Sequence, residues 1–126
     1  MDYFEINGLK KLNGIVNVSG AKNAVLPLMA AAILNKGSLK ISNVPTLSDS
    51  LTMSKLIEEM GGKVKFNRGN SILLDTSKLN KPFAPYDLVK TMRASFYVLG
   101  PLIARFGEAK VSLPGGCAWG LSLIHI

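Results

Sequence analysis

A short pattern that recurs 70 positions later constrains what this 126-residue chain can fold into. In each copy the end of an apolar run is followed by a glycine and then by a strand-like run. The first copy holds Ile33, Gly37, Lys40, Ile41 and Ser42, and the second holds Ile103, Gly107, Lys110, Val111 and Ser112. Two such helix-to-strand joints predict an α/β fold with duplicated βα units. Chance similarity between two joints of this kind is the alternative.

Composition narrows the class of protein. The length of 126 residues corresponds to about one domain. Hydrophobic residues make up 48% of the chain, which is too high a fraction for a disordered segment. The longest apolar run, 24–34, is interrupted by Pro27 and is too short to span a bilayer. Residues 1–5 lack the basic and then apolar order of a signal peptide, and a single cysteine cannot form an internal disulfide. We therefore expect a cytoplasmic protein without a membrane segment.

The net charge of +7 favours anionic partners. The 15 lysines and arginines are scattered, without a dense basic run and with few aromatic residues between them. This distribution argues against nucleic acid and acidic membranes as partners and favours a small molecule that bears phosphate.

The order of the expected elements follows from periodicity and breaker residues. Segments 3–6 and 14–18 are expected to be strands. Segment 24–34 is expected to be a helix that starts close to Lys22 and Asn23 or is kinked there, because Pro27 is tolerated only in a first turn. Gly37 should cap that helix before a strand at 39–44. One of Ser48, Asp49 and Ser50 should cap the start of a second helix. This helix should bury a stripe of Met53, Leu56, Ile57 and Met60.

The second half should contain a hairpin and a long helix. Segments 64–66 and 72–74 flank a turn at 67–70, as in a β-hairpin. Asp87 should cap a helix from about 88 to 106, kinked near Gly100, before a strand at 109–113. On such a helix Arg93 and Tyr97 would share a face, and the 70-residue offset places Arg93 opposite Asn23.

Two positions suit anion chemistry. Lys22 and Asn23 lie at an expected helix start, where N–H groups and the helix dipole attract anions, although a solvated lysine and a simple cap would look the same. Cys117 lies in the loop 114–120 with three glycines, whose backbone can approach a ligand closely. Positive charge nearby would lower the pKa of a thiol and activate it, whereas an ordinary lone cysteine is a buried apolar residue.

Three motifs together resemble the UDP-N-acetylglucosamine enolpyruvyl transferase family. They are Ser-Gly-Ala-Lys-Asn-Ala at 19–24, Ala-Pro-Tyr-Asp-Leu-Val-Lys-Thr-Met-Arg-Ala-Ser at 84–95 and Val-Ser-Leu-Pro-Gly-Gly-Cys at 111–117. The resemblance runs in register from residue 1 to about 120. It implies an inside-out α/β barrel built from βαβαββ repeats, here truncated, because the full enzyme has two domains of three repeats with the active site between them.

The resemblance also implies a reaction and roles. The enolpyruvyl group of phosphoenolpyruvate would pass to the 3-hydroxyl of UDP-N-acetylglucosamine with release of phosphate, the committed step of bacterial peptidoglycan synthesis. Cys117 corresponds to the cysteine that protonates or covalently binds phosphoenolpyruvate and reacts with fosfomycin. Lys22 corresponds to a phosphoenolpyruvate ligand, Asn23 to a sugar-nucleotide ligand, Arg93 to a phosphate ligand and Tyr97 to an aromatic residue near uridine. No metal or organic cofactor is implied.

The sequence departs from the family after Cys117. Ser122 stands where an arginine that binds phosphoenolpyruvate is typical, and 121–126 is an apolar tail that we expect to be foreign or frame-altered. Residues 1–120 would then be an incomplete transferase region, inactive without the C-terminal part of the enzyme. Two alternatives remain: a shikimate-phosphate enolpyruvyl transferase, and a noncatalytic module that binds phosphate or nucleotide sugars.

Overall fold

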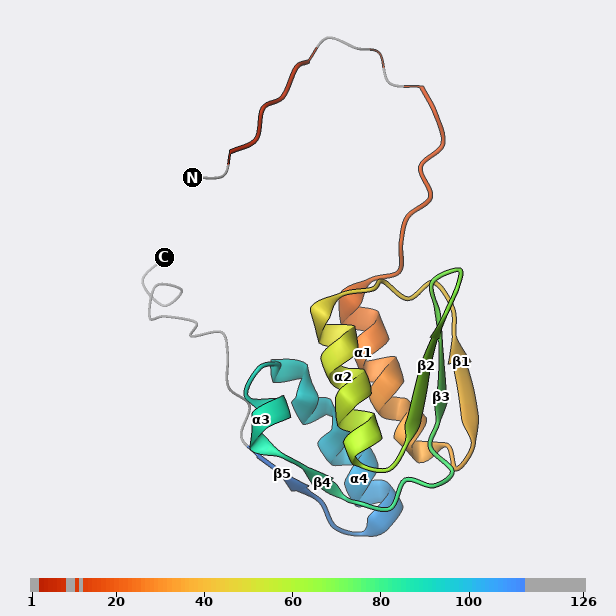
Figure 1. Ribbon diagram of the computed structural model, residues 1–126, viewed down its shortest axis with the longest axis vertical. Coiled ribbons are helices and arrows are strands. Elements are labelled where there is room, and N and C mark those ends of the chain that lie inside the picture. The colour runs from red at the N-terminus through yellow and green to blue at the C-terminus, as the bar shows by residue number, and fades with distance from the viewer. Residues whose placement is uncertain (1–2, 9–10, 12, 113–126) are drawn as a thin grey trace.

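The computed structural model describes residues 3–8, 11 and 13–112. Helices and strands alternate in it as in an α/β protein (Figure 1). The helices are α1 (Lys22–Ala31), α2 (Ser48–Glu59), α3 (Tyr86–Val89) and α4 (Leu99–Phe106), with 3₁₀ helices η1 (Ala32–Leu34) and η2 (Arg93–Val98). The strands are β1 (Ser38–Ile41), β2 (Lys63–Asn67), β3 (Ser71–Asp75), β4 (Phe83–Ala84) and β5 (Lys110–Val111).

A three-stranded sheet has the order β1-β3-β2, and both neighbours of β3 are antiparallel to it. β1 and β2 therefore point the same way, joined by α2, with β3 between them. The hairpin prediction is confirmed, and its turn has positive φ at Gly69 and Asn70. Alternation along β3 buries Leu74 and leaves Leu73 37% exposed, because successive side chains point to opposite faces.

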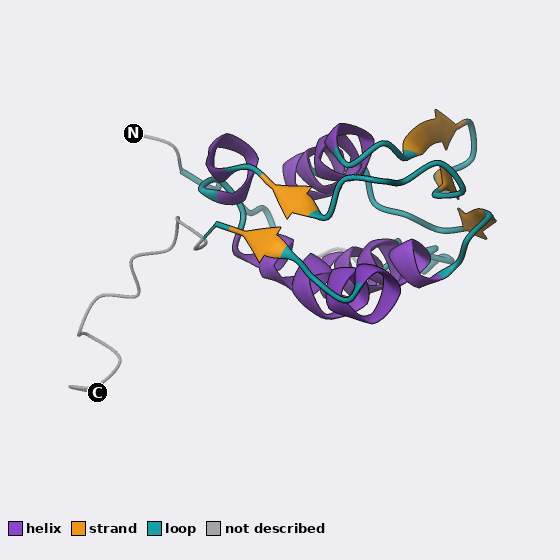
Figure 2. Cartoon of the chain, turned by 90° about the horizontal axis from the view of Figure 1, so that it is seen from below, coloured by secondary structure: helices purple, strands orange, loops and turns teal. Residues whose placement is uncertain are grey.

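The second sheet pairs β4 with β5 in parallel, so that Phe83 lies opposite Lys110 (Figure 2). α3, η2 and α4 form the crossover between these strands. The 70-residue offset relates 22–34, which contains α1 and η1, to 92–104, which contains η2 and most of α4. Each helical pair leads into a strand, so both joints of the repeat are present in the fold.

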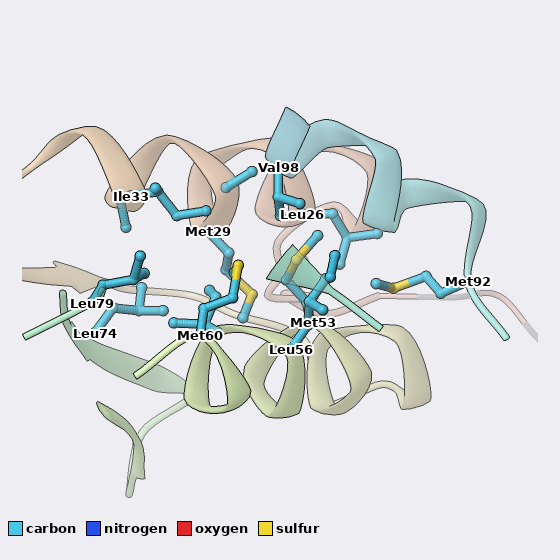
Figure 3. Packing of buried hydrophobic residues seen from close by; sticks show 14 of the residues in the cluster. Leu26, Met29, Ile33, Met53, Leu56, Met60, Leu74, Leu79, Met92 and Val98 are labelled. Atoms are coloured by element: carbon cyan, nitrogen blue, oxygen red, sulfur yellow. The ribbon is translucent and has the colours of Figure 1, made fainter. Parts of the chain in front are cut away.

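The core lies between the α1 and α4 segments on one side and α2 with the sheet on the other (Figure 3). The stripe expected on the second helix is confirmed: Met53, Leu56, Ile57 and Met60 are completely buried. α1 contributes Leu26 and Met29 to the same cluster. One contiguous core therefore holds both halves of the repeat together.

The helix ends differ from two expectations. α2 begins at Ser48 with Leu47 as N-cap, and Ser50 reaches back to accept a hydrogen bond from the Leu47 N–H at 3.1 Å. Gly37 does not cap the first helical segment, which ends at Leu34 with an extended Asn35. Gly107 does end α4 in the left-handed conformation, with φ of 78°.

The expected helix 88–106 is wrong as one unit. Asp87 lies inside α3 rather than capping a helix, and Met92 is extended, with φ of −147°, between α3 and η2. The side chain of Met92 is 3% exposed, so tertiary packing draws it into the core at the expense of helix continuity. Gly100 lies in the first turn of α4, where the following proline is tolerated without a kink.

A polar cluster closes the end of η1. The Arg105 guanidinium donates hydrogen bonds to the carbonyls of Ile33 and Thr76, each at 2.8 Å. The buried Thr76 hydroxyl lies 3.0 Å from the carbonyl of Ala32. These hydrogen bonds join the end of η1 to the segment that follows β3 and to α4.

The expected strands 3–6 and 14–18 are not strands among the described residues. This segment runs away from the body of the molecule (Figure 1), and Phe4 and Ile15 are 98% and 94% exposed. A strand needs a neighbour to receive its hydrogen bonds, and none of the described strands pairs with either segment.

No helix in the part of the chain that the structure describes is long and apolar enough to cross a membrane.

Acid is expected to weaken the fold at the end of β3. Hydrogen bonds from the Ser77 hydroxyl at 2.7 Å and the Ser77 N–H at 3.0 Å lower the pKa of Asp75 below its ordinary value of 3.8. The stability from this carboxylate is thus complete above 3.8 and is lost as the pH falls through the lower folded pKa. Urea unfolding at about pH 5 and about pH 2.5 should show a smaller acid loss for Asp75→Asn and for Ser77→Ala. An unchanged acid loss in both variants would contradict this assignment.

Candidate functional site

Lys22 is the first residue of α1, as expected from the sequence. The N–H groups of Ala24 and Val25 both donate to the carbonyl of Ala21 at 3.1 Å, which fixes the first turn. Gly20 approaches the backbone so closely that a Cβ there would lie 1.9 Å from the carbonyl oxygen of Asn43. Only glycine fits this approach, so the entry of the chain into α1 is set by its contact with the loop after β1.

Asn23 follows Lys22 and is exposed at the same helix start. Pro27 is the sixth residue of α1 rather than part of its first turn, which differs from the expected position. Because proline has no N–H, the Asn23 carbonyl cannot receive the hydrogen bond that residue i+4 supplies in a regular helix. The first turn of α1 therefore presents polar backbone as well as the Asn23 side chain.

The ammonium group of Lys22 forms an ion pair with Asp49 in the first turn of α2. The distance from Nζ to Oδ2 is 2.6 Å, and the side chains are 48% and 25% exposed. The contact joins the starts of two helices that are 26 residues apart in the sequence. Sequence reasoning treated Asp49 only as a candidate cap, because nothing local indicates that α1 and α2 begin side by side.

Arg93 begins η2, which packs against α1, while α4 packs against η1. This pairing makes the two helical segments run in the same direction, so Arg93 and Lys22 begin their helices at the same end of the layer. The expected correspondence between Arg93 and Asn23 agrees with this arrangement. Two helix starts at one end of a layer, each with a cationic side chain, favour an anionic ligand.

Tyr97 is 51% exposed on η2. The expectation that it shares a face with Arg93 is wrong, because a 3₁₀ helix has three residues per turn and aligns positions i and i+3. Phe96, rather than Tyr97, falls in the same row as Arg93. The short period follows from the break at Met92, which a continuous α-helical reading of the sequence does not anticipate.

Cys117 and the loop 114–120 lie outside the described residues. The last described residue, Ser112, donates its N–H to the carbonyl of Ala84 at 3.3 Å. Because β4 and β5 are parallel, the end of β5 lies beside the start of α3, which follows β4 directly. Among the described residues, no three His, Cys, Asp or Glu side chains gather as they would around a metal ion.

The comparisons with known proteins identify the class. The model of the EPSP synthase family (3-phosphoshikimate 1-carboxyvinyltransferase) matches residues 6–120. The chain therefore belongs to the EPSP synthase family. The structure of the enolpyruvyl transferase NikO from Streptomyces tendae is similar with a TM-score of 0.70 at 26% identity, covering 78% of this chain and 23% of that one. The expected enolpyruvyl-transferase-like fold is confirmed.

Relatives that share more than half of their aligned residues with this chain carry one name. The chain is 55% identical over 120 residues to the UDP-N-acetylglucosamine 1-carboxyvinyltransferase of Dichelobacter nodosus, which covers 95% of this chain and 29% of the relative. It is 52% identical over 126 residues to the enzyme of that name from Campylobacter hominis, covering 100% of this chain and 30% of the relative. The chain thus spans less than a third of the length of these relatives, which are transferases by name.

Proposed function

We propose that this chain supplies part of the substrate site of an enzyme that transfers the enolpyruvyl group of phosphoenolpyruvate to the 3-hydroxyl of UDP-N-acetylglucosamine. The observation that carries the proposal is the 55% identity over 95% of the chain to a relative named for this activity. The same identity favours UDP-N-acetylglucosamine over 3-phosphoshikimate as the acceptor. The reaction would belong to peptidoglycan precursor synthesis in the cytoplasm.

The described residues support the binding part of this proposal. Lys22 and Arg93 begin parallel helical segments at the same end, where two cations and two helix starts favour the phosphate and carboxylate of phosphoenolpyruvate. Asn23 lies beside Lys22 and offers an amide for hydrogen bonds to the sugar. Tyr97, half-exposed on the same 3₁₀ helix as Arg93, offers an aromatic face for uridine.

The chemistry is addition followed by elimination. In the first step the acceptor oxygen bonds to C2 of phosphoenolpyruvate, the 3-hydroxyl loses its proton, and C3 gains one. In the second step C3 gives up a proton and the bond from C2 to the phosphate oxygen breaks, which releases phosphate. We assign Cys117 either to proton donation at C3 or to a covalent adduct at C2, and Lys22 to stabilisation of the phosphate charge.

A chimeric enzyme tests the proposal. Residues 1–120 of this chain would replace the 120 matching residues of the Dichelobacter nodosus relative, and phosphate release from phosphoenolpyruvate would be measured. We expect release that requires UDP-N-acetylglucosamine and falls by at least about 100-fold in Cys117→Ala and Lys22→Ala. Release supported by 3-phosphoshikimate instead would assign the other acceptor. A folded chimera that binds both substrates without turnover would favour a noncatalytic binding module.

The 126-residue chain alone has a simpler assay. We expect it to be inactive in catalysis, with 1–120 as the transferase region and 121–126 as a separate tail. Mass spectrometry after treatment with fosfomycin, an epoxide that reacts with activated thiols, should show a single adduct at Cys117 that UDP-N-acetylglucosamine accelerates. Cys117→Ser is the control, because the chain has no other cysteine. A binding module has no reason to activate this thiol and would remain unlabelled.

A further inference from the structure

Lys22 and Asp49 form an ion pair between the first turns of α1 and α2. We propose that Asp49 is a positioning residue that fixes the Lys22 ammonium group for an anionic substrate. The inference rests on the proposed function, in which Lys22 binds phosphoenolpyruvate. It adds to that site a residue from a different helix, 27 positions along the chain from Lys22. The geometry that supports it is the 2.6 Å distance between Nζ and Oδ2.

The carboxylate of Asp49 is held from several directions. It lies in the first turn of α2, where the helix dipole stabilises negative charge. Its other oxygen, Oδ1, accepts a hydrogen bond from the Ser48 hydroxyl at 3.4 Å. The turn is anchored by Ser50, whose hydroxyl lies 2.8 Å from the carbonyl of Leu47 and 3.0 Å from that of Pro45. The Asp49 carboxylate is therefore held in a position where it can accept a hydrogen bond from the longer Lys22 side chain.

Lys22 is the mobile partner of the pair. A lysine side chain has four rotatable bonds, and ordering it on a ligand costs conformational entropy. Its backbone is already fixed by the close approach of Gly20 to Asn43, and the bond to Asp49 fixes the end of the side chain. The Lys22 side chain is still 48% exposed, and an ammonium group has three N–H donors, so donors remain for an incoming anion. The ordering cost is thus met before the substrate arrives.

Stability alone does not account for the pair. An ion pair in which one partner is half-exposed contributes little to the free energy of unfolding, because solvent screens it. The Asp49 charge also repels an anion, and solvent at a half-exposed site screens this repulsion. The proposal requires that the ordering of Lys22 outweighs the screened repulsion.

The test is a titration of the 126-residue chain with phosphoenolpyruvate, followed by the NMR shifts of the backbone amides of 20–26. We expect Asp49→Asn to weaken binding by about fivefold or more and Asp49→Glu to restore it to within about twofold. The order parameter of the Lys22 Cε should fall in Asp49→Asn before any ligand is added. Glu59→Gln is the matched control, because it removes the same charge from the other end of α2, where Glu59 pairs with Lys81 at 3.8 Å.

The outcomes separate this inference from the proposed function. If Lys22→Ala abolishes binding while Asp49→Asn binds as tightly as the unchanged chain or more tightly, the substrate site stands and the positioning role is overturned. Equal losses in Asp49→Asn, Asp49→Glu and Glu59→Gln would indicate a general charge or folding effect and would also overturn it. If Lys22→Ala binds as tightly as the unchanged chain, both the positioning role and the proposed role of Lys22 are wrong.

Discussion

Leu74→Ala is expected to lower the free energy of unfolding by roughly 2 to 5 kcal/mol, because it removes buried methyl groups and leaves a cavity. Leu74 is completely buried on β3, the central strand of the three-stranded sheet. It lies opposite Leu39 on β1 and Val64 on β2, so the cavity would face both neighbouring strands as well as the helices. Urea unfolding followed by circular dichroism measures the change.

Leu73→Ala is the control for the same strand. Leu73 points to the opposite face of the sheet and is 37% exposed, between Lys40 and Lys65 in the register. The same chemical change should cost about 0.5 kcal/mol, since solvent fills the space. Similar losses in the two variants would show that this sheet buries both faces, contrary to the packing described above.

Arg105→Met is expected to destabilise the fold by roughly 2 to 3 kcal/mol. The guanidinium donates to the carbonyls of Ile33 and Thr76 at 2.8 Å, with a third carbonyl, that of Leu79, at 3.4 Å. Methionine keeps the apolar stem but has no donor, so these carbonyls lose a charged hydrogen-bond partner. The contact fastens α4 to η1 and to the segment after β3, so the loss should appear in global unfolding.

Two variants calibrate the Arg105 result. Arg68→Met removes the same charge from the exposed hairpin turn and should change stability by less than about 0.5 kcal/mol. Arg105→Lys keeps the charge but replaces a planar fork with a single ammonium, so we expect an intermediate loss. If Arg105→Lys were as stable as the unchanged chain, charge rather than the geometry of the fork would explain the contact.

Elements defined by short-range patterns follow from the sequence. The i, i+3, i+4, i+7 stripe of Met53, Leu56, Ile57 and Met60 identifies the buried face of α2, and alternation around Gly69 identifies the hairpin. The start of α1 near Lys22 agrees with the polar residues that precede the apolar run, although Pro27 lies deeper in the helix than the sequence argument placed it. The placement of the motif 19–24 at a helix start likewise depends only on neighbouring residues.

Other predictions from the sequence are wrong because contacts between residues far apart in the chain decide the structure there. Met92 leaves the helical path when its side chain enters the core, and the helix expected at 88–106 divides there into shorter pieces. Segments 3–6 and 14–18 have strand-like sequences, but none of the described strands pairs with them. Periodicity reports what a segment can form, whereas pairing requires a neighbour.

The sequence by itself determined the family and the residue types of the candidate site, because each motif is a contiguous stretch of residues that can be recognised without the fold. The tertiary structure alone decided which helix starts meet. α1 and η2 run in the same direction, and Lys22 on α1 forms an ion pair with Asp49 on α2. Such contacts depend on how the helices pack over a shared core, so spacing along the chain does not reveal them.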